Sequence, residues 1–469
     1  MIIDIDTSIV LLYLIGVVSL GVWAGRNVRS FSDYAVADRS YSAFIIFASL
    51  AASFIGGGFT MGNAEKTFLF GIASSLVLWG FSLKEILVAK FIAPRMGQFS
   101  KALSLGDMLL PSYGLTGKVG VGIFSVLFCM GLVGAQVSAI GYIFEVLLNV
   151  PRFLGVTVGC GIVVAYVTLG GIRAVVLTDI IQFLVLAVGL PLTLLFGLLS
   201  IGSWSTFVEN VPADHFTLLG SMSLLSFVSL FISFFLGEAL VPPYVLRLLI
   251  AKNARHAARG TLWSGLFSIP FLLVTGFIGL VAFNLDPSLN ANLALPYTVQ
   301  NVLPIGLKGI VIAAIISVVM SSSDSFLNSA GVALTNDIVM PLRQRPLSPR
   351  QALIVAKLTT LFVGIAAIIF ALNVESVLDL LLLAYDFWAP AVLPLIVAAI
   401  FGLRANKYVF CSSVAAGVLS MSMWKYVLHN PWDINGLIIG TVINSLVLIM
   451  TTRRQRLTFG VKEIGPVSN

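Results

Sequence analysis

A run of small hydroxyl-bearing residues interrupts an apolar stretch in the second half of the chain. Residues 317–329 read Ser-Val-Val-Met-Ser-Ser-Ser-Asp-Ser-Phe-Leu-Asn-Ser. On a helix, Val318, Ser321 and Ser325 share one face, because side chains three and four positions apart lie above one another. Hydroxyl, carbonyl and carboxylate oxygens are the ligands that hard cations prefer. Serines also let helices pack closely. Packing alone gives no reason for Asp324, however, so we interpret the run as a cation site.

A second acid, Asp179, lies in residues 170–182, which read Gly-Gly-Ile-Arg-Ala-Val-Val-Leu-Thr-Asp-Ile-Ile-Gln. The position is near the start of an apolar segment, and two interpretations stay open. The carboxylate could join the serines in binding a cation, or it could pair with Arg173 or lie at the membrane interface.

Two apolar stretches carry helix breakers in their interior. Residues 51–60 read Ala-Ala-Ser-Phe-Ile-Gly-Gly-Gly-Phe-Thr, and each glycine weakens a helix by about 1 kcal/mol relative to alanine. Residues 236–244 read Leu-Gly-Glu-Ala-Leu-Val-Pro-Pro-Tyr, and prolines remove backbone donors. Glycine and proline are common in membrane helices in any case. Breaks at corresponding positions of two halves nevertheless favour paired discontinuous helices that hold a solute and ions near the middle of a bilayer.

These residues lie in a chain whose composition excludes an ordinary soluble domain. Of its 469 residues, 58% are hydrophobic and 10% are charged, whereas soluble domains carry about 25% charged residues. Apolar runs of about 20 residues, the length that crosses a bilayer, recur throughout. We expect an all-α protein, because helices satisfy the backbone of such segments in lipid. The thirteen predicted transmembrane helices are residues 7–25, 43–65, 70–93, 119–148, 153–170, 176–200, 223–249, 260–285, 306–336, 351–372, 377–402, 409–428 and 435–452.

The loops between these segments alternate in charge. Basic residues gather in every second loop, and the opposite loops hold acids such as Glu209, Asp214 and Asp286. Basic loops are typically cytoplasmic, so we expect the N-terminus outside and the C-terminus inside a plasma (inner) membrane. The net charge of +7 then reflects topology and not nucleic-acid binding. The first segment follows an acidic start, so we interpret it as a retained span and not a cleaved signal peptide.

The order of the breaks predicts one transmembrane domain over residues 1–469. A five-helix unit at 43–200 and a second at 223–402 would face opposite ways, because an odd number of spans inverts the topology. One further helix (7–25) precedes them, and two (409–452) follow. The sequence shows no Ser-His-Asp, HExxH, Walker or Rossmann pattern and no metal or redox spacing of its three cysteines. We therefore do not expect an enzyme.

The motifs at 170–182 and 320–329 resemble those of the sodium/solute symporter family, whose form also has thirteen helices with the N-terminus outside. The resemblance extends over essentially the whole chain. Within the family, the glycine run with Phe59 and the run at 321–325 are most similar to the high-affinity choline transporter branch. Tyr244 with Arg247 also fits that branch.

The resemblance implies sodium as the coupling ion and names its ligands. The family's conserved sodium site would use the backbone carbonyls of Ala52, Ile55 and Val318 and the hydroxyls of Ser321 and Ser322. Some members hold a second sodium nearer the cytoplasm. The matching residues for that ion are Asp179, Ser321, Asp324 and Ser325.

For the solute the resemblance gives a weaker template. The choline-type aromatic cage aligns with Phe54, Phe81, Leu132 and Val241, of which only two are aromatic, so a large quaternary ammonium fits poorly. Glu238 could bind an amine, or it could cap the broken helix. Lys84 could face the cavity or extend to the membrane surface, the commoner fate of such lysines. The candidate substrate-binding residues are Phe54, Gly56, Gly57, Phe81, Gln136, Glu238 and Val241.

Together these features predict a multi-pass symporter that imports a small organic solute with sodium by alternating access, with an amine-bearing or zwitterionic compound as the expected solute. The expected partners are sodium, the solute and the lipid bilayer. Two alternatives stay open: a proton-coupled transporter of the same fold, with Asp179 or Asp324 as the carrier, and a transporter-like substrate sensor. A sensor would need an output domain, and the tail after Thr452 is short for one.

Overall fold

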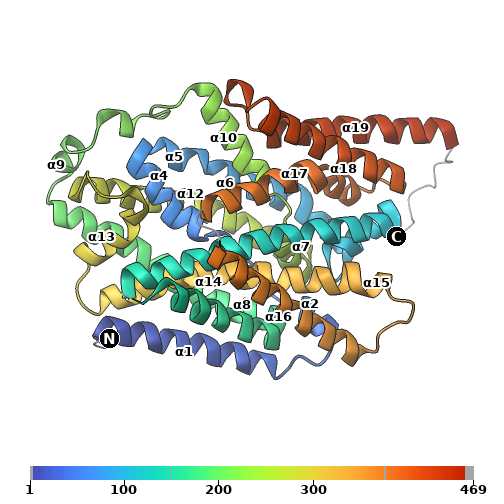
Figure 1. Cartoon of the computed structure of the whole chain (residues 1–469), viewed down its shortest axis with the longest axis horizontal. Coiled ribbons are helices and arrows are strands. Elements are labelled where there is room, and N and C mark those ends of the chain that lie inside the picture. Colours follow the sequence, from blue (N-terminus) through green and yellow to red (C-terminus); the bar gives the residue numbers. More distant parts are fainter. Residues whose placement is uncertain (1–3, 149, 374–376, 460–469) are drawn as a thin grey trace.

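The computed structural model describes residues 4–148, 150–373 and 377–459, and helices account for most of these ranges (Figure 1). Seven helices of the described part are long and apolar enough to cross a membrane, or nine if each of two bent pairs counts as one span. The prediction of an all-helical multi-pass protein is confirmed, while the count of thirteen and the orientation stay predictions. The longest helices are α1 (Ile5–Gly25), α7 (Leu105–Leu148), α8 (Arg152–Ile201), α12 (Ala254–Leu285), α14 (Leu307–Ala333), α16 (Pro349–Asn373), α17 (Val377–Ile400), α18 (Lys407–Ser422) and α19 (Gly436–Phe459).

Shorter helices connect the long ones. They are α2 (Phe31–Val36), α5 (Ala73–Val77), α6 (Trp79–Leu87), α9 (Trp204–Glu209), α13 (Ala294–Val302) and α15 (Met340–Leu342). Short segments of 3-10 or π geometry are η1 (Gly58–Gly62), η2 (Val88–Ile92), η3 (Ala93–Phe99), η4 (Ala213–Phe216), η5 (Ala291–Leu293), η6 (Leu334–Val339), η7 (Met423–Val427) and η8 (Pro431–Asp433).

Both predicted helix breaks are confirmed. α3 (Ala43–Phe54) ends before the glycine run and meets the segment of η1 and α4 (Asn63–Phe70) at 66°. α10 (Leu224–Gly237) and α11 (Pro242–Ile250) meet at 51°. Proline is well suited to the first position of α11, because the missing N–H would have no helical partner there. The local sequence thus sets where each helix stops and restarts.

A turn at Gly171 divides α8 into two helical segments. Its φ of 53° and ψ of −146° are not helical, and an L side chain rarely adopts this backbone. A Cβ there would also lie 2.5 Å from the carbonyl oxygen of Tyr34. The turn falls at the boundary predicted between spans 153–170 and 176–200. α7 begins at Leu105, well before the predicted span 119–148, with a similar turn at Gly114.

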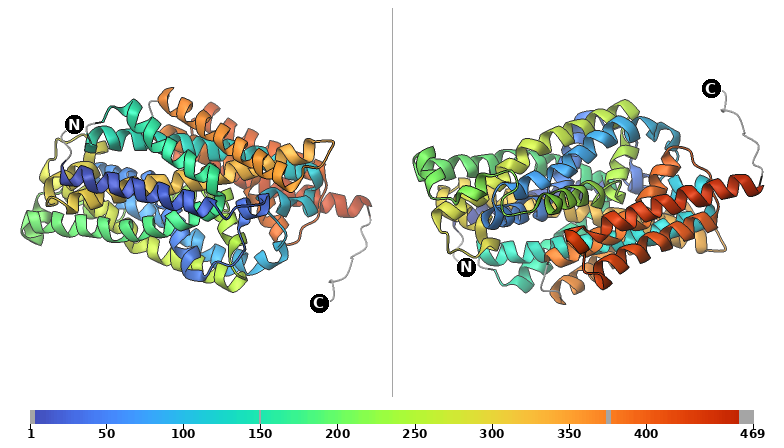
Figure 2. Two further views of the ribbon diagram at one scale, coloured as in Figure 1. Left: turned by 90° about the horizontal axis from the view of Figure 1, so that it is seen from below. Right: turned by 90° about the horizontal axis from the view of Figure 1, so that it is seen from above.

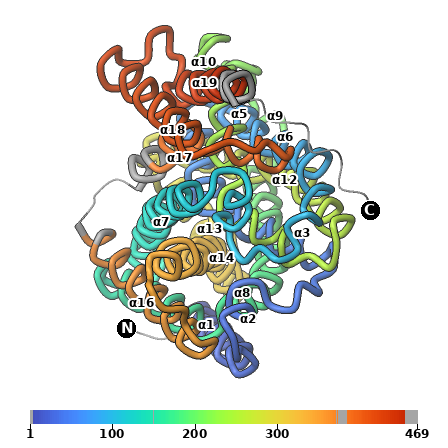
Figure 3. Tube along the Cα trace, turned by 90° about the vertical axis from the view of Figure 1, so that its right-hand side faces the viewer, coloured from blue at the N-terminus to red at the C-terminus, as the bar shows by residue number. Residues whose placement is uncertain are grey.

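α14 lies inside the bundle. Viewed along the helices, it is surrounded by its neighbours, while α18 and α19 lie at one edge and α1 and α2 at the opposite edge (Figure 3). Every residue from Val311 to Ala333 is buried. A helix buried on all sides must satisfy its polar groups through neighbouring helices. Figures 1 and 2 also place the start of α1 and the end of α19 at opposite ends of the bundle.

Candidate functional site

The break in α3 lies against the serine run of α14. The Ser321 hydroxyl donates to the carbonyl oxygen of Ala52 at 2.7 Å and to that of Val318 at 3.1 Å. The Ser322 hydroxyl donates to the carbonyl oxygen of Ser53 at 2.8 Å and to that of Val318 at 3.2 Å. Because α3 stops at the glycine run, its last carbonyls have no helical partner and are free to accept these bonds.

This group of oxygens has the chemistry of a sodium site. Two hydroxyls and three carbonyls from α3 and α14 converge in a fully buried position, and a cation would bind their lone pairs once the hydroxyl hydrogens turned away. The structure brings Ala52, Val318, Ser321 and Ser322 together as the resemblance implied. Ile55, the fifth residue, follows α3 in non-helical backbone (φ −74°, ψ 66°). The carbonyl of Ser53 was missed, although it belongs to the same helix end.

Asp179 is paired with a residue that the sequence did not connect to it. Its Oδ2 accepts a hydrogen bond from the Ser49 hydroxyl at 2.5 Å and lies 3.0 Å from the Arg247 Nη2. Both side chains of this ion pair are completely buried. The alternative partner, Arg173, binds Asp38 at 2.7 Å, so the interpretation that pairs Asp179 with Arg173 is wrong.

A protein cation lies among the residues proposed for a second sodium, and the Ser325 hydroxyl donates to Asp324 Oδ1 at 3.1 Å. The guanidinium of Arg247 bridges Asp179 and the hydroxyl of Ser325. Asp324 turns toward α8, where the hydroxyl of Tyr166 donates to its Oδ2 at 2.5 Å. Ser321 contacts α3 instead. In this arrangement the donor set does not fit a second sodium, because a protein cation already binds two of its members.

A small pocket lies between the two helix breaks. It is lined by Ser53, Phe54, Gly56, Gly58, Phe59, Leu132, Gln136, Glu238, Tyr244, Ser322, Phe326 and Tyr385. Among the predicted substrate residues, Phe54, Gly56, Gln136 and Glu238 therefore belong to the lining.

The other predicted substrate residues, Gly57, Phe81 and Val241, are not part of the pocket lining. The Gly57 amide donates to the side-chain oxygen of Gln136 at 3.2 Å. The ring of Phe81 packs behind Phe54 with centroids 4.5 Å apart. Val241 is buried but is not part of the lining described above.

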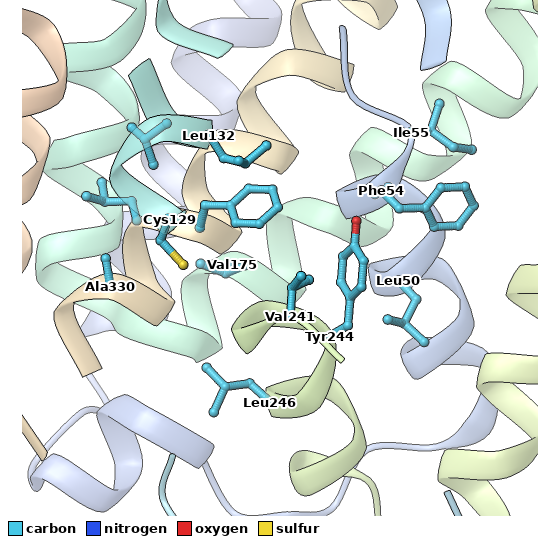
Figure 4. Packing of buried hydrophobic residues seen from close by; sticks show 14 of the residues in the cluster. Leu50, Phe54, Ile55, Cys129, Leu132, Val175, Val241, Tyr244, Leu246 and Ala330 are labelled. Carbon is cyan, nitrogen blue, oxygen red and sulfur yellow. The ribbon is translucent and has the colours of Figure 1, made fainter. Parts of the chain in front are cut away.

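Aromatic side chains from five helices or turns surround the pocket. The rings of Phe54 and Phe59 lie 6.3 Å apart, and that of Tyr244 lies 6.4 Å from Phe326. In Figure 4, Tyr244 rises from α11 with its hydroxyl directed to the level of Phe54. Tyr385 comes from α17, and no sequence motif marked it. Two of the four aligned cage positions are not aromatic, yet the pocket is aromatic through Phe54 and through residues outside that set.

Glu238 lies at the break between α10 and α11 and is buried. Tyr244 donates its hydroxyl to Oε2 at 2.7 Å, and Tyr385 donates to Oε1. Lys84 is buried at 2% exposure, so of its two interpretations the one that extends it to the membrane surface is wrong. Its ammonium lies 2.5 Å from Glu85 and 3.4 Å from the backbone carbonyl of Glu238.

The sequence is similar to a known protein family over most of its length. The model of the sodium:solute symporter family matches residues 34–417. The chain is 24% identical to a sodium/proline symporter of Escherichia coli over 88% of this chain and 86% of that one. It is 25% identical to high affinity choline transporter 1 of Homo sapiens over 88% and 75%. Choline and proline transporters thus match about equally well, and the choline branch is not singled out.

The fold agrees with that of a solved transporter. A sodium-coupled sialic acid symporter in a substrate-bound outward-open state superposes with a TM-score of 0.84 at 20% identity, covering 99% of both chains. At that identity the likeness shows the fold alone. The family match spans most of the chain, and the helical architecture agrees with it. The chain is therefore a multi-pass membrane protein of the sodium:solute symporter family, in which sodium is the coupling ion.

Proposed function

We propose that this protein imports a small organic solute that carries a cationic amine, alone or in a zwitterion, together with sodium across a plasma (inner) membrane. The proposal includes thirteen transmembrane helices, the N-terminus outside, and two inverted five-helix units at 43–200 and 223–402. The single observation that carries the choice of solute is the buried carboxylate of Glu238 in the aromatic pocket between the helix breaks.

The charges around the pocket favour a solute that carries a cationic amine. Lys84 is held by Glu85 at 2.5 Å, so that pair is neutral, and among the described residues no cationic side chain forms an ion pair with the carboxylate of Glu238. A buried charge is costly unless it is paired. An ammonium group would supply the missing charge, and neighbouring rings such as Phe54 and Tyr244 would stabilise it through their faces. Glu238 would thus act as a ligand and not only as a cap.

Sodium would bind at the end of α3. Its ligands would be the carbonyls of Ala52, Ile55 and Val318 and the hydroxyls of Ser321 and Ser322. Ser53 and Ser322 belong both to the pocket lining and to the hydrogen bonds between α3 and α14. Sodium bound there would hold the two helices together and favour the conformation that binds the solute, since a ligand shifts a conformational equilibrium through its differential affinity.

The test is uptake by purified protein in liposomes, with amines, amino acids, betaines and organic acids as solutes. We expect uptake of at least one amine-bearing compound that depends on an inward sodium gradient. Glu238→Gln should abolish high-affinity uptake of that compound, while Glu145→Gln, at an exposed position of α7, should not. Preferred uptake of an anionic solute, or uptake that is insensitive to Glu238→Gln, would refute the choice of solute. Uptake driven by a pH gradient without sodium would refute the proposed sodium site.

A further inference from the structure

Arg247 of α11 is a fully buried cation at the position where a second sodium would be expected. Its Nη2 lies 3.0 Å from Asp179 Oδ2 and 3.0 Å from the Ser53 hydroxyl, and it also contacts the Ser325 hydroxyl. Its Nε donates to the Ser49 hydroxyl at 3.1 Å. The guanidinium therefore binds oxygens from α3, α8 and α14 at once, as a metal ion shared by these helices would.

The oxygens that Arg247 uses are the oxygens that a second sodium would need. Asp179 and Ser325 are two of the four residues that the family resemblance assigned to that ion. A guanidinium at hydrogen-bond distance excludes a sodium ion from the same oxygens, because two positive charges a few ångströms apart repel strongly where water is absent. The side chain and the ion are thus alternatives for one position.

The charge of the cluster points the same way. Asp179 and Arg247 form an ion pair in which both side chains are completely buried, so the pair is neutral. A sodium ion bound at the same oxygens would add a positive charge without a partner in a medium that disfavours it.

We propose that Arg247 takes the place of the second sodium, so that this protein binds and moves a single sodium ion with each solute. The inference rests on the proposed sodium coupling and goes beyond it. Arg247 acts as a positioning residue: it docks α11 onto the helices that hold the ion.

Arg247 lies close to a set of hydrogen bonds that fix the end of α11. It is three residues before Ile250, whose carbonyl accepts a hydrogen bond from the amide of Tyr41 at 3.4 Å. The amide of Lys252 donates to the carbonyl of Tyr41 at 2.9 Å, and Arg39 donates to the carbonyl of Leu249 at 3.1 Å. These bonds join the end of α11 to the segment that follows α2. The chain itself thus holds the cation of Arg247 in position, whereas a sodium ion would have to arrive from solution.

The experiment counts radiolabelled sodium ions bound at saturation to the purified full-length protein in detergent. We expect one ion per wild-type molecule. Arg247→Ala vacates the oxygens of Asp179 and Ser325 and should bind one ion more than the wild type. Arg247→Lys, which keeps a cation, and the double variant Arg247→Ala/Asp179→Asn, which removes the carboxylate as well, should not gain an ion.

The outcomes separate this inference from the proposed function. Two ions bound by the wild type, or an Arg247→Ala variant that binds no more ions than the wild type, would overturn the inference while leaving sodium coupling intact. No ion in the wild type and one in Arg247→Ala would support the role of Arg247 but refute the sodium site at Ala52 and Ser321. If Arg247→Ala does not fold, the wild-type count decides, since one ion supports the inference and two ions overturn it.

Discussion

Replacing Ser322 by alanine tests whether the oxygens at the end of α3 bind sodium. The hydroxyl of Ser322 donates to the carbonyl oxygens of Ser53 and Val318 at 2.8 and 3.2 Å, and its oxygen is one of the five proposed ligands. A hydrogen bond or dipole contact to a charged group contributes about 1.5–3 kcal/mol. Since about 1.4 kcal/mol corresponds to a factor of ten, the sodium concentration for half-maximal binding should rise roughly 10- to 150-fold.

The neighbouring residue provides a matched control. Ser323 is equally buried on the same helix, but its hydroxyl donates to the carbonyl of Val319 at 2.7 Å, within α14. Ser323→Ala loses a hydroxyl of the same size without touching α3. The assay is radiolabelled sodium binding to each purified variant, with thermal melting in detergent to confirm that both are folded. An unchanged sodium affinity in Ser322→Ala, or an equal loss in both variants, would refute the proposed ligand set.

Three further substitutions test the pocket and the packing. Tyr385→Phe removes a hydroxyl that donates to Glu238 and should weaken amine uptake about five-fold, for a loss of about 1 kcal/mol, without changing sodium affinity; an unchanged half-saturating amine concentration would contradict the role of Glu238. Gly279→Ala places a Cβ 2.9 Å from the carbonyl carbon of Ala64 and should destabilise the protein by about 1–3 kcal/mol, measured as a lower melting temperature. Gly161→Ala, where a Cβ meets nothing within 4 Å, is its control and should not lower the melting temperature. Asp6→Ala removes the carboxylate that accepts the amides of Gly306 and Gly309 at 2.7 and 2.8 Å and should cost about 1–3 kcal/mol, whereas Asp6→Asn keeps an acceptor oxygen and should melt close to the wild type.

The helix breaks were predictable because their cause is local. Three glycines end α3 after Phe54, and two prolines start α11 at Pro242, and both effects arise from the backbone of the residues themselves. The serine run was equally visible, since close helix packing accounts for its serines but not for Asp324 among them. The family resemblance, and not these local signals, implied that Ser321 and Ser322 lie beside the end of α3, where the structure has them.

The ion pair of Asp179 was not predictable by the same reasoning. Its partner, Arg247, is 68 residues away in the sequence, while Arg173 is only six residues away and binds Asp38 across 135 residues. Sequence separation gives no measure of which helices pack together. A charge on a buried face of α11 was the available signal, because such a residue must have a partner in the interior.

The positions of Lys84 and Tyr385 were not predicted from the sequence, for two other reasons. The commonest fate of a membrane lysine is extension to the surface, but the adjacent Glu85 forms an ion pair with Lys84 that allows both to be buried. Tyr385 lies on a long apolar helix without any motif. Its contact with Glu238 depends on how α17 packs against the break of α10 and α11, which the sequence pattern does not specify.

The proposed sodium site and the proposed solute site share atoms, and this sharing gives coupling a physical form. Ser322 contributes to the pocket wall and bonds the carbonyl of Ser53, while Phe54 and Gly56, the next residues of the break, line the pocket. An ion that fixes the end of α3 against α14 therefore also fixes the wall that the solute contacts. Each ligand then lowers the conformational cost of binding the other, and linkage requires that this effect be reciprocal. Arg247 extends the same logic to α11, because its contacts with Asp179, Ser53 and Ser325 connect this helix to the carbonyl end of α3 that would hold the ion.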